Sequence, residues 1–165
     1  MNYPFICHNA AVANGWWEEP KTKAMNYALV ISELMEALEA VRKDRYTDRE
    51  AYEKAQDFSL VKDTFEDELG DAMIRIFDWM GWNSYAWKKA PPVKFRGTLE
   101  EDLLEIIQRA IDATKSISEE YVANELLASI ELFWQTYGKS KDRDFHIQKK
   151  LEFNATRGHK HGKKF

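Results

Sequence analysis

Two pairs of carboxylates are the residues of this sequence whose types and spacing best suit chemistry. Glu33 and Glu36 form a Glu-x-x-Glu pair, and Glu68 and Asp71 form a Glu-x-x-Asp pair. Residues three apart on a helix point the same way, so each pair sets two negative charges side by side. On a partly apolar face this crowding costs energy unless a cation lies between the carboxylates.

The ligand chemistry of these pairs favours a hard metal ion. All four side chains offer oxygen only, which suits Mg²⁺, with Mn²⁺ as the alternative. Mg²⁺ is usually held together with substrate phosphates, so the pairs predict a phosphorylated ligand. A di-iron carboxylate bundle needs a His three residues after a Glu, and no Glu here has one. Each pair taken alone is also typical of a solvated helix face, and that alternative stays open.

The elements that must position these carboxylates are the two strongest helical patterns in the chain. Residues 21–44 contain no Gly or Pro and place apolar side chains along a broad face. Residues 60–82 carry a second apolar stripe, with Glu68 at its edge and Asp71 about 60° further round the helix. Both pairs therefore lie beside apolar surface, which favours a metal site.

The rest of the chain predicts further helices and no strand. Residues 1–20 have no helical pattern and are expected to form an irregular N-terminal arm, and residues 154–165 a basic C-terminal tail without helix. Thr98 and Glu101 have the spacing of a capping box. Additional helices are predicted at residues 47–56, 98–116, 118–137 and 142–153. We expect one all-α domain over residues 1–165, a bundle of four to five helices.

Composition narrows the classes of protein and of ligand. The chain has 165 residues, a net charge of −4 and a single cysteine, Cys7, so no intramolecular disulfide forms and a reducing, cytoplasmic location is expected. No apolar run approaches the roughly 20 residues of a membrane span. Residues 149–165 hold six Lys or Arg against one Glu. This basic end predicts an anionic ligand, whereas the acidic balance argues against a nucleic acid polymer.

Several segments of the sequence resemble one known family. Ser-Glu-Leu-Met-Glu-Ala-Leu-Glu-Ala at 32–40 and Glu-Asp-Glu-Leu-Gly-Asp at 66–71 resemble the MazG-like all-α nucleoside triphosphate pyrophosphohydrolases. Gly-Trp-Trp-Glu-Glu-Pro at 15–20 is similar to the start of a MazG-like subset. The tail is similar as well, with Lys-Leu-Glu-Phe-Asn-Ala-Thr-Arg at 150–157 and His-Gly-Lys-Lys at 161–164. The matches bracket nearly the whole chain.

Two regions depart from the family pattern. Thirty-one residues separate Glu36 from Glu68, which is longer than the usual gap. The extra length falls in residues 42–59, whose role stays open. The predicted helices over 98–137 match nothing specific and would serve packing or assembly.

The resemblance implies a fold, a reaction and a metal site. The fold is the helix bundle of the all-α nucleoside triphosphate pyrophosphohydrolases. The reaction is hydrolysis of a nucleoside or deoxynucleoside triphosphate to the monophosphate and pyrophosphate. Glu33, Glu36, Glu68 and Asp71 would hold Mg²⁺, which bridges the phosphates and lowers the pKa of a bound water. One of these carboxylates or a neighbour would take the proton, and the sequence leaves open which one.

Five further residues are candidates for binding substrate. Lys150, Asn154 and Arg157, at spacings of four and three, lie near one side of a continuing helical turn and suit phosphate oxygens. The alternative for them is a solvated basic tail. Trp16 and Trp17 offer a stacking face for the base, or else they pack the N-terminal arm.

Two other classes of protein remain as rivals, and an assembly is expected. A non-catalytic regulatory module would bind nucleotide and Mg²⁺ without turnover. A helical interaction protein would have solvated carboxylates and no Mg²⁺-linked stabilisation. Because residues 21–44 are apolar on two sides, we expect a homodimer or homotetramer.

Overall fold

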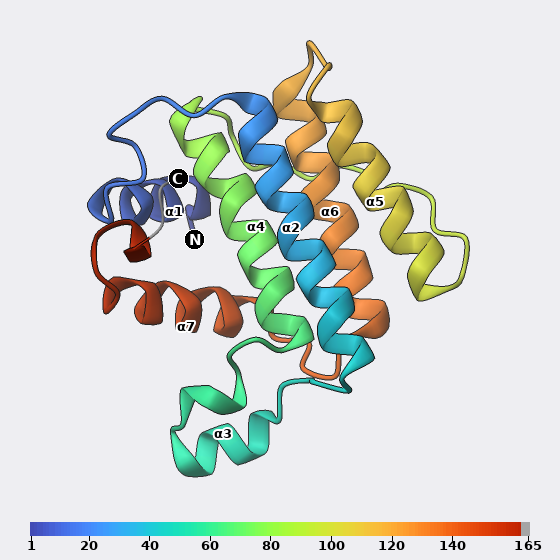
Figure 1. Cartoon of the computed structure of the whole chain (residues 1–165). Helices are drawn as coiled ribbons and strands as arrows, with labels where there is room; N and C mark the ends of the chain where they lie inside the picture. The colour runs from blue at the N-terminus through green and yellow to red at the C-terminus, as the bar shows by residue number, and fades with distance from the viewer. Residues whose placement is uncertain (163–165) are drawn as a thin grey trace.

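Four long helices packed side by side form the body of the molecule (Figure 1). In chain order they are α2 (Lys23–Arg42), α4 (Phe65–Trp82), α5 (Leu99–Ala113) and α6 (Glu119–Tyr137). Around them lie α1 (Tyr3–Ala13), α3 (Arg49–Ala55) and α7 (Arg143–Ala155), with the 3₁₀ turns η1 (Phe58–Leu60) and η2 (His159–Gly162). The computed structural model describes residues 1–162, and no strand occurs among them, which confirms the all-α prediction.

The apolar stripes of the long helices meet in one core. Leu34 of α2, Leu69 and Ile76 of α4, Ile106 of α5 and Phe133 of α6 are all fully buried. Burying each side chain of this size contributes roughly 1.5–3 kcal/mol. α2 and α4 run antiparallel beside one another, with α1 and α7 on the far side of α4 (Figure 1). Residues on facing turns of α2 and α4 are therefore held in a fixed register.

The N-terminal segment is not the irregular arm that the sequence predicts, because Tyr3–Ala13 forms α1. Pro4 lies in the first turn, where its missing N–H breaks no helical hydrogen bond. Tyr3 is buried and stacks on Phe77 of α4 with ring centroids 5.2 Å apart. A Cβ on Gly81 would come within 2.3 Å of the Pro4 oxygen, so the glycine permits this close approach. Packing on α4 stabilises the helix, which is why local periodicity did not reveal it.

The helix expected at residues 60–82 begins later, at Phe65. The Thr64 side chain caps it by accepting a hydrogen bond from the Asp67 backbone N–H at 3.3 Å. Asp63, just before the cap, has a φ of +55°, which turns the chain sharply away from the helix. Three elements of the described chain were not expected, namely α1 and the turns η1 and η2. Residues 1–162 hold seven α-helices, so the predicted number of four to five was too low.

The other predicted boundaries agree well with the structure. Asp48 caps α3, and Thr98 caps α5 by accepting from the Glu101 N–H at 3.3 Å. α7 continues to Ala155 and η2 follows it, so the segment after Asn154 is more helical than expected. Residues 163–165 of the predicted tail lie outside the described residues.

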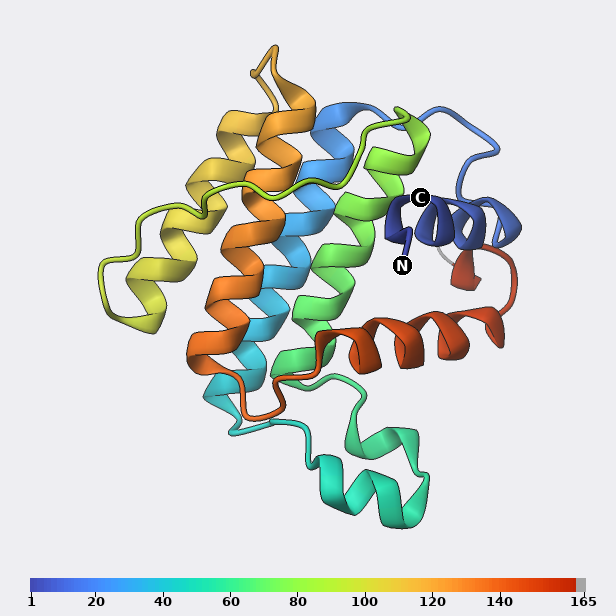
Figure 2. The same cartoon turned by 180° about the vertical axis from the view of Figure 1, so that it is seen from behind.

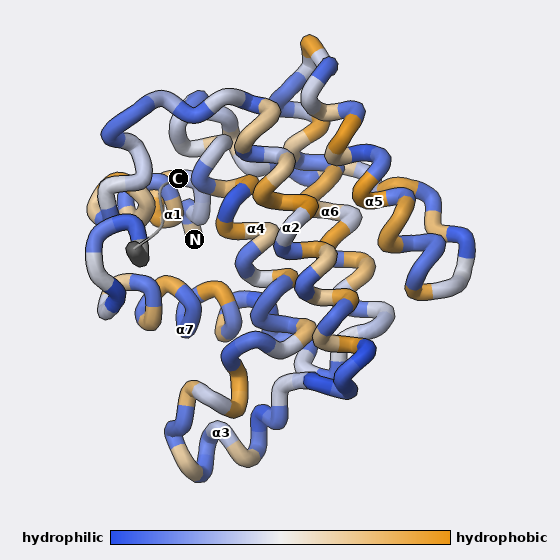
Figure 3. Tube along the Cα trace, in the orientation of Figure 1, coloured by the Kyte–Doolittle hydropathy of each residue, from blue (hydrophilic) through white to orange (hydrophobic). Residues whose placement is uncertain are grey.

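The connection from α4 to α5 runs along the outer face of α6, as Figure 2 shows. Side chains of α6 fix it, because Asn124 Oδ1 accepts from the Lys88 N–H at 2.6 Å and Ser129 Oγ from the Val93 N–H at 2.9 Å. Hydrophobic residues recur along the long helices, whereas the segment around α3 is largely hydrophilic (Figure 3). None of the helices described in residues 1–162 has both the length and the apolar composition that a membrane crossing needs.

Candidate functional site

Carboxylates of α2 and α4 meet at the interface of these two helices. Oxygens of Glu33, Glu36 and Glu68 all lie within 4.8 Å of one another, and we call these three residues the carboxylate cluster. Glu33 is 6% exposed and Glu68 is 5% exposed, while Glu36 faces solvent. The antiparallel register of α2 and α4 thus brings together three of the four predicted metal ligands.

The carboxylate cluster has more acidic groups than cationic partners, and this crowding shows in their raised pKa values. Burial raises the pKa of Glu68 to about 9, and no cationic side chain of the described chain lies within ion-pair distance of it. Burial also raises the pKa of Glu33 above its usual value, although Arg75 opposes this. The Arg75 Nε donates to Glu33 Oε1 at 2.7 Å. A further cation at this place would relieve the remaining repulsion.

Asp71, the fourth predicted ligand, lies at the edge of the cluster and pairs with a lysine. Its Oδ2 is 2.8 Å from Lys150 Nζ, which is also 2.7 Å from Asp67 Oδ2. Burial would lower the pKa of Lys150, but Asp71 and Asp67 hold it above its usual value. Burial raises the pKa of Asp67 to about 6. Oxygens of Asp63, Asp67 and Glu68 form a second close group.

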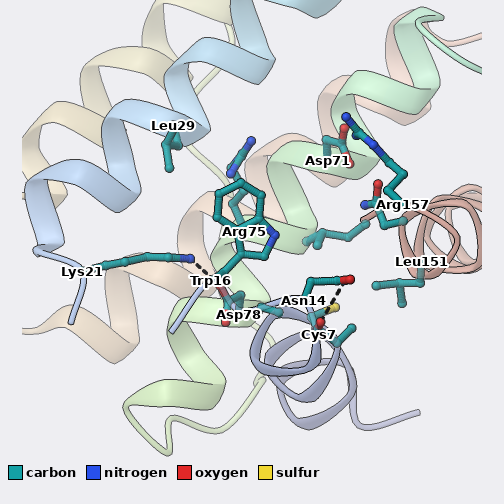
Figure 4. Close-up of a pocket in the computed structure, with 14 residues that line it drawn as sticks. Cys7, Asn14, Trp16, Lys21, Leu29, Asp71, Arg75, Asp78, Leu151 and Arg157 are labelled. Carbon is teal, nitrogen blue, oxygen red and sulfur yellow. Dashed lines mark hydrogen bonds and ion pairs between the residues drawn. The ribbon is translucent and has the colours of Figure 1, made fainter. Parts of the chain in front are cut away.

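A pocket opens beside the carboxylate cluster, walled by α1, α2, α4 and α7 (Figure 4). The space between its lining residues amounts to about 810 Å³, a volume that includes open solvent. Trp16, Asp71, Arg75, Asn154 and Arg157 are among its lining residues. The Asn154 Oδ1 is buried without a hydrogen-bond partner among the described residues. Four of the predicted site residues therefore share one pocket with a basic side chain that the sequence did not single out.

Trp17 is placed differently from Trp16. It does not line the pocket, and its ring stacks on Trp82 at 4.4 Å between centroids. Its Nε1 donates to Asp78 Oδ1 at 2.7 Å, and Lys21 Nζ lies 3.2 Å from the other oxygen of that carboxylate. Asp78 thus fastens the segment after α1 to α4.

Sequence reasoning missed two charged residues of the site. Arg75 follows Asp71 by four residues, so the spacing alone places it on the same helix face. Asp67 stands between two other acids, but no local signal shows that it faces Lys150, 83 residues further on. Arg75 could have been found from helix periodicity, whereas the role of Asp67 could be recognised only from the three-dimensional structure.

The donor set fits a hard divalent cation. Only oxygen ligands are present in the carboxylate cluster, and two of its three members are buried with raised pKa values. Mg²⁺ and Mn²⁺ prefer such ligands, whereas zinc sites usually include nitrogen or sulfur. The residues present are therefore suited to Mg²⁺.

Comparison of the chain with protein-family models, with curated proteins and with solved structures gives no match.

Proposed function

We propose that the protein is a Mg²⁺-dependent nucleotide pyrophosphohydrolase that cleaves a nucleoside or deoxynucleoside triphosphate to the monophosphate and pyrophosphate. One observation carries the proposal. The carboxylate cluster, built only of oxygen ligands, is joined through the Glu33–Arg75 ion pair to a pocket that is also lined by Trp16 and Arg157. A nucleotide has the matching parts, namely an aromatic base, an anionic phosphate chain and a need for a divalent cation. The resemblance of the two acidic segments to the MazG-like enzymes supports the same reaction.

The metal ligands in this proposal are Glu33, Glu36, Glu68 and Asp71. When bound, Mg²⁺ supplies Lewis-acid polarisation of the phosphate oxygens and lowers the pKa of water. Asp71 lines the pocket and also borders the cluster, so its carboxylate is placed where substrate and metal would meet. Lys150 keeps Asp71 in position through their 2.8 Å ion pair.

The nucleotide in this proposal lies in the pocket of Figure 4. The ring of Trp16 offers a stacking surface for the base. The guanidinium of Arg157 suits bidentate contact with phosphate, and the unpartnered Asn154 Oδ1 accepts a hydrogen bond from base or sugar. Trp17 supports the site indirectly, because its bond to Asp78 fixes the segment that presents Trp16.

The deciding experiment measures pyrophosphate release from a panel of nucleoside and deoxynucleoside triphosphates with Mg²⁺. The wild type is compared with Glu68→Gln and with Glu100→Gln, a control that changes an exposed carboxylate on α5. We expect release by the wild type, a loss of about 100-fold or more in Glu68→Gln, and no change in Glu100→Gln. No release from any nucleotide with Mg²⁺ or Mn²⁺ contradicts the enzyme. Mg²⁺-dependent nucleotide binding without release would instead establish the non-catalytic regulatory module.

The assembly we propose is a homodimer or homotetramer in a reducing, cytoplasmic setting. Large apolar side chains are exposed on the adjacent helices α2 and α5, namely Met35 at 48%, Leu104 at 63% and Ile111 at 40%. Cys7, the one cysteine, is buried and free. Light scattering at working concentration is expected to give a multiple of 19.4 kDa, and a monomer contradicts the assembly.

A further inference from the structure

A hollow lies where the end of α2 meets the start of α4 (Figure 1). Its charged lining residues are four acids and two bases, namely Glu36, Glu39, Asp63, Glu68, Lys43 and Arg45. Lys43 Nζ already lies 3.1 Å from Glu39 Oε1. Arg45 Nη2 donates to the Lys62 carbonyl at 3.0 Å. Because the acids outnumber the bases, this hollow, which we call the acidic hollow, attracts cations and repels anions.

Three acids at the start of α4 bring their carboxylates together beside this hollow. Asp63 precedes the helix, while Asp67 and Glu68 lie in its first turn. One oxygen of each lies within 4.8 Å of the others, and we call these three residues the second acidic group. Oxygen ligands lie about 2.0–2.6 Å from a bound Mg²⁺ or Ca²⁺, so oxygens at such separations can share one ion. Asp63 and Glu68 also line the acidic hollow, so the group can be reached from solvent there.

Glu68 is the member of the second acidic group whose surroundings most clearly indicate a ligand. It is 5% exposed and lines the acidic hollow. Among residues 1–162, no group donates a hydrogen bond to its carboxylate, and no cationic side chain lies within ion-pair distance of it. Burying an acid without a partner costs free energy, and a purely structural role gives no return for that cost. The carboxylate is therefore placed to bind a ligand that enters the hollow.

Asp67 is fully buried, and its two carboxylate oxygens have different surroundings. Oδ2 accepts from the Asp63 N–H at 2.9 Å and lies 2.7 Å from Lys150 Nζ. Oδ1 is buried and has no hydrogen-bond partner among the described residues. One oxygen thus fixes the orientation of the carboxylate, as outer contacts do for metal ligands, and the other remains for a ligand. Lys150 also pairs with Asp71, 2.8 Å away, which limits its repulsion of a cation.

We propose that the second acidic group binds a second divalent cation, of the oxygen-preferring class that includes Mg²⁺ and Mn²⁺, in the acidic hollow. Asp63, Asp67 and Glu68 each supply one carboxylate oxygen, and water from the open side completes the coordination. Glu68 belongs to the carboxylate cluster as well, so it bridges this cation and the cation of the proposed function. The inference rests on the proposed function only for that first cation, because the second set of ligands needs no nucleotide.

The test counts the Mn²⁺ ions bound per full-length chain without nucleotide, by electron paramagnetic resonance of the Mn²⁺ that stays free in solution. Asp63→Gly is compared with the wild type and with the matched control Asp44→Gly. Asp63 and Asp44 have φ of +55° and +50°, angles that glycine adopts without strain. The Asp44 side chain is 85% exposed and pairs with Lys139, outside the second acidic group. We expect Asp63→Gly to bind one Mn²⁺ fewer than the wild type, and Asp44→Gly to bind the same number.

Two further variants show that the ion is a second one and that the loss is local. Glu33→Gln changes the carboxylate cluster alone, so it is expected to keep the ion that depends on Asp63, and the double variant Glu33→Gln/Asp63→Gly to lose it. Asp63→Asn keeps an oxygen ligand but not the charge, and is expected to weaken this ion at least tenfold. Thermal unfolding in EDTA checks that each variant is folded, and Asp63→Asn decides the matter if Asp63→Gly is not.

The outcomes separate this inference from the proposed function. Equal numbers of Mn²⁺ in Asp63→Gly and the wild type overturn the inference, even where the wild type hydrolyses triphosphates. An equal loss in Asp44→Gly overturns it as well, and so does a Glu33→Gln variant from which Asp63→Gly removes no further ion. Conversely, a wild type that releases no pyrophosphate from any nucleotide, yet binds a Mn²⁺ that depends on Asp63, keeps the inference and removes the enzyme.

Discussion

Two buried acids of α4, only two residues apart, differ in the number of hydrogen bonds that their carboxylates accept. Glu66 is fully buried and accepts three backbone hydrogen bonds, from Thr47 at 2.9 Å, Lys139 at 2.6 Å and Ser140 at 3.0 Å. Glu68 is nearly as buried, and burial raises its pKa to about 9. Glu66 ties three segments of the chain together. Glu68 has no comparable partners, which is the condition expected of a ligand that awaits a cation.

The same contrast separates the α5–α6 side of the molecule from the α2–α4 side. Asp102 of α5 is buried, yet it accepts from Tyr137 Oη at 2.7 Å and from the Arg96 N–H at 2.6 Å. Burial alone would raise the pKa of Asp102, but these hydrogen bonds hold it below its usual value. Buried acids on the α5–α6 side are thus satisfied within the protein. Within residues 1–162, Arg75 is the one ion-pair partner of the two buried acids of the carboxylate cluster, which is the arrangement we expect of a binding site rather than of a structural contact.

The largest expected effect comes from exchanging the two α4 acids for their isosteres. Glu66→Gln places an amide N–H against backbone donors, so we expect a loss of about 3 kcal/mol in the free energy of unfolding. For a chain of this size that lowers Tm by roughly 10 °C. Glu68→Gln replaces a carboxyl that burial keeps protonated by an amide of the same shape, so it is expected to leave Tm unchanged without Mg²⁺. Chemical denaturation of both variants in EDTA measures this. If both substitutions lowered the free energy of unfolding equally, the assignment of a structural role to Glu66 and a binding role to Glu68 would be wrong.

A smaller effect is expected in the pH dependence of stability. The folded pKa of Glu68, about 9, lies above the ordinary glutamate value of 4.5, so between these values the unfolded chain binds fewer protons than the folded one. The free energy of unfolding therefore falls as pH rises, by about 2 kcal/mol between pH 7 and pH 9 in EDTA. We expect the fall to be absent in Glu68→Gln and kept in Glu66→Gln. Denaturation curves across this range decide it, and an unchanged slope in Glu68→Gln would assign the titration to another group.

The affinity for Mg²⁺ is expected to depend on pH through the same carboxyl group. Binding requires the ionised form of Glu68, so the apparent affinity for Mg²⁺ is expected to increase with pH over the same range. Saturating Mg²⁺ should also raise Tm, since it binds only the folded protein. A Tm that does not respond to Mg²⁺ at pH 9 would favour a structural helical protein with solvated acids.

The sequence predicted what depends on local periodicity. α2 and α4 were recognisable because their apolar residues recur on one face, and the spacing of Glu33, Glu36 and Glu68 then placed three carboxylates together. α1 was missed because its stability comes from packing on α4, around Gly81, and not from its own pattern. The sequence pattern within α1 carries no information about α4, its distant packing partner in the chain.

Ion pairs between distant segments were also not predictable from local sequence patterns. Lys150 was predicted near phosphates as part of a basic tail, and the structure places it inside the protein between Asp67 and Asp71. The pairing depends on how α7 crosses α4, which no spacing within either helix encodes.

The smallest expected effect compares two threonine caps, of which Thr64 is buried and also bonds Thr47 Oγ1 at 2.8 Å and the Val61 carbonyl at 2.6 Å. Thr98 and Thr64 each accept one backbone hydrogen bond at 3.3 Å, but Thr98 starts α5 and Thr64 starts α4, one turn before Glu68. Thr98→Ala should cost about 1 kcal/mol and leave the Mg²⁺-dependent rise in Tm unchanged. Thr64→Ala should also reduce that rise, because the cap fixes the turn that carries Glu68. If Thr98→Ala reduces it equally, global stability and not local geometry governs Mg²⁺ binding, and the division between the two sides of the molecule fails.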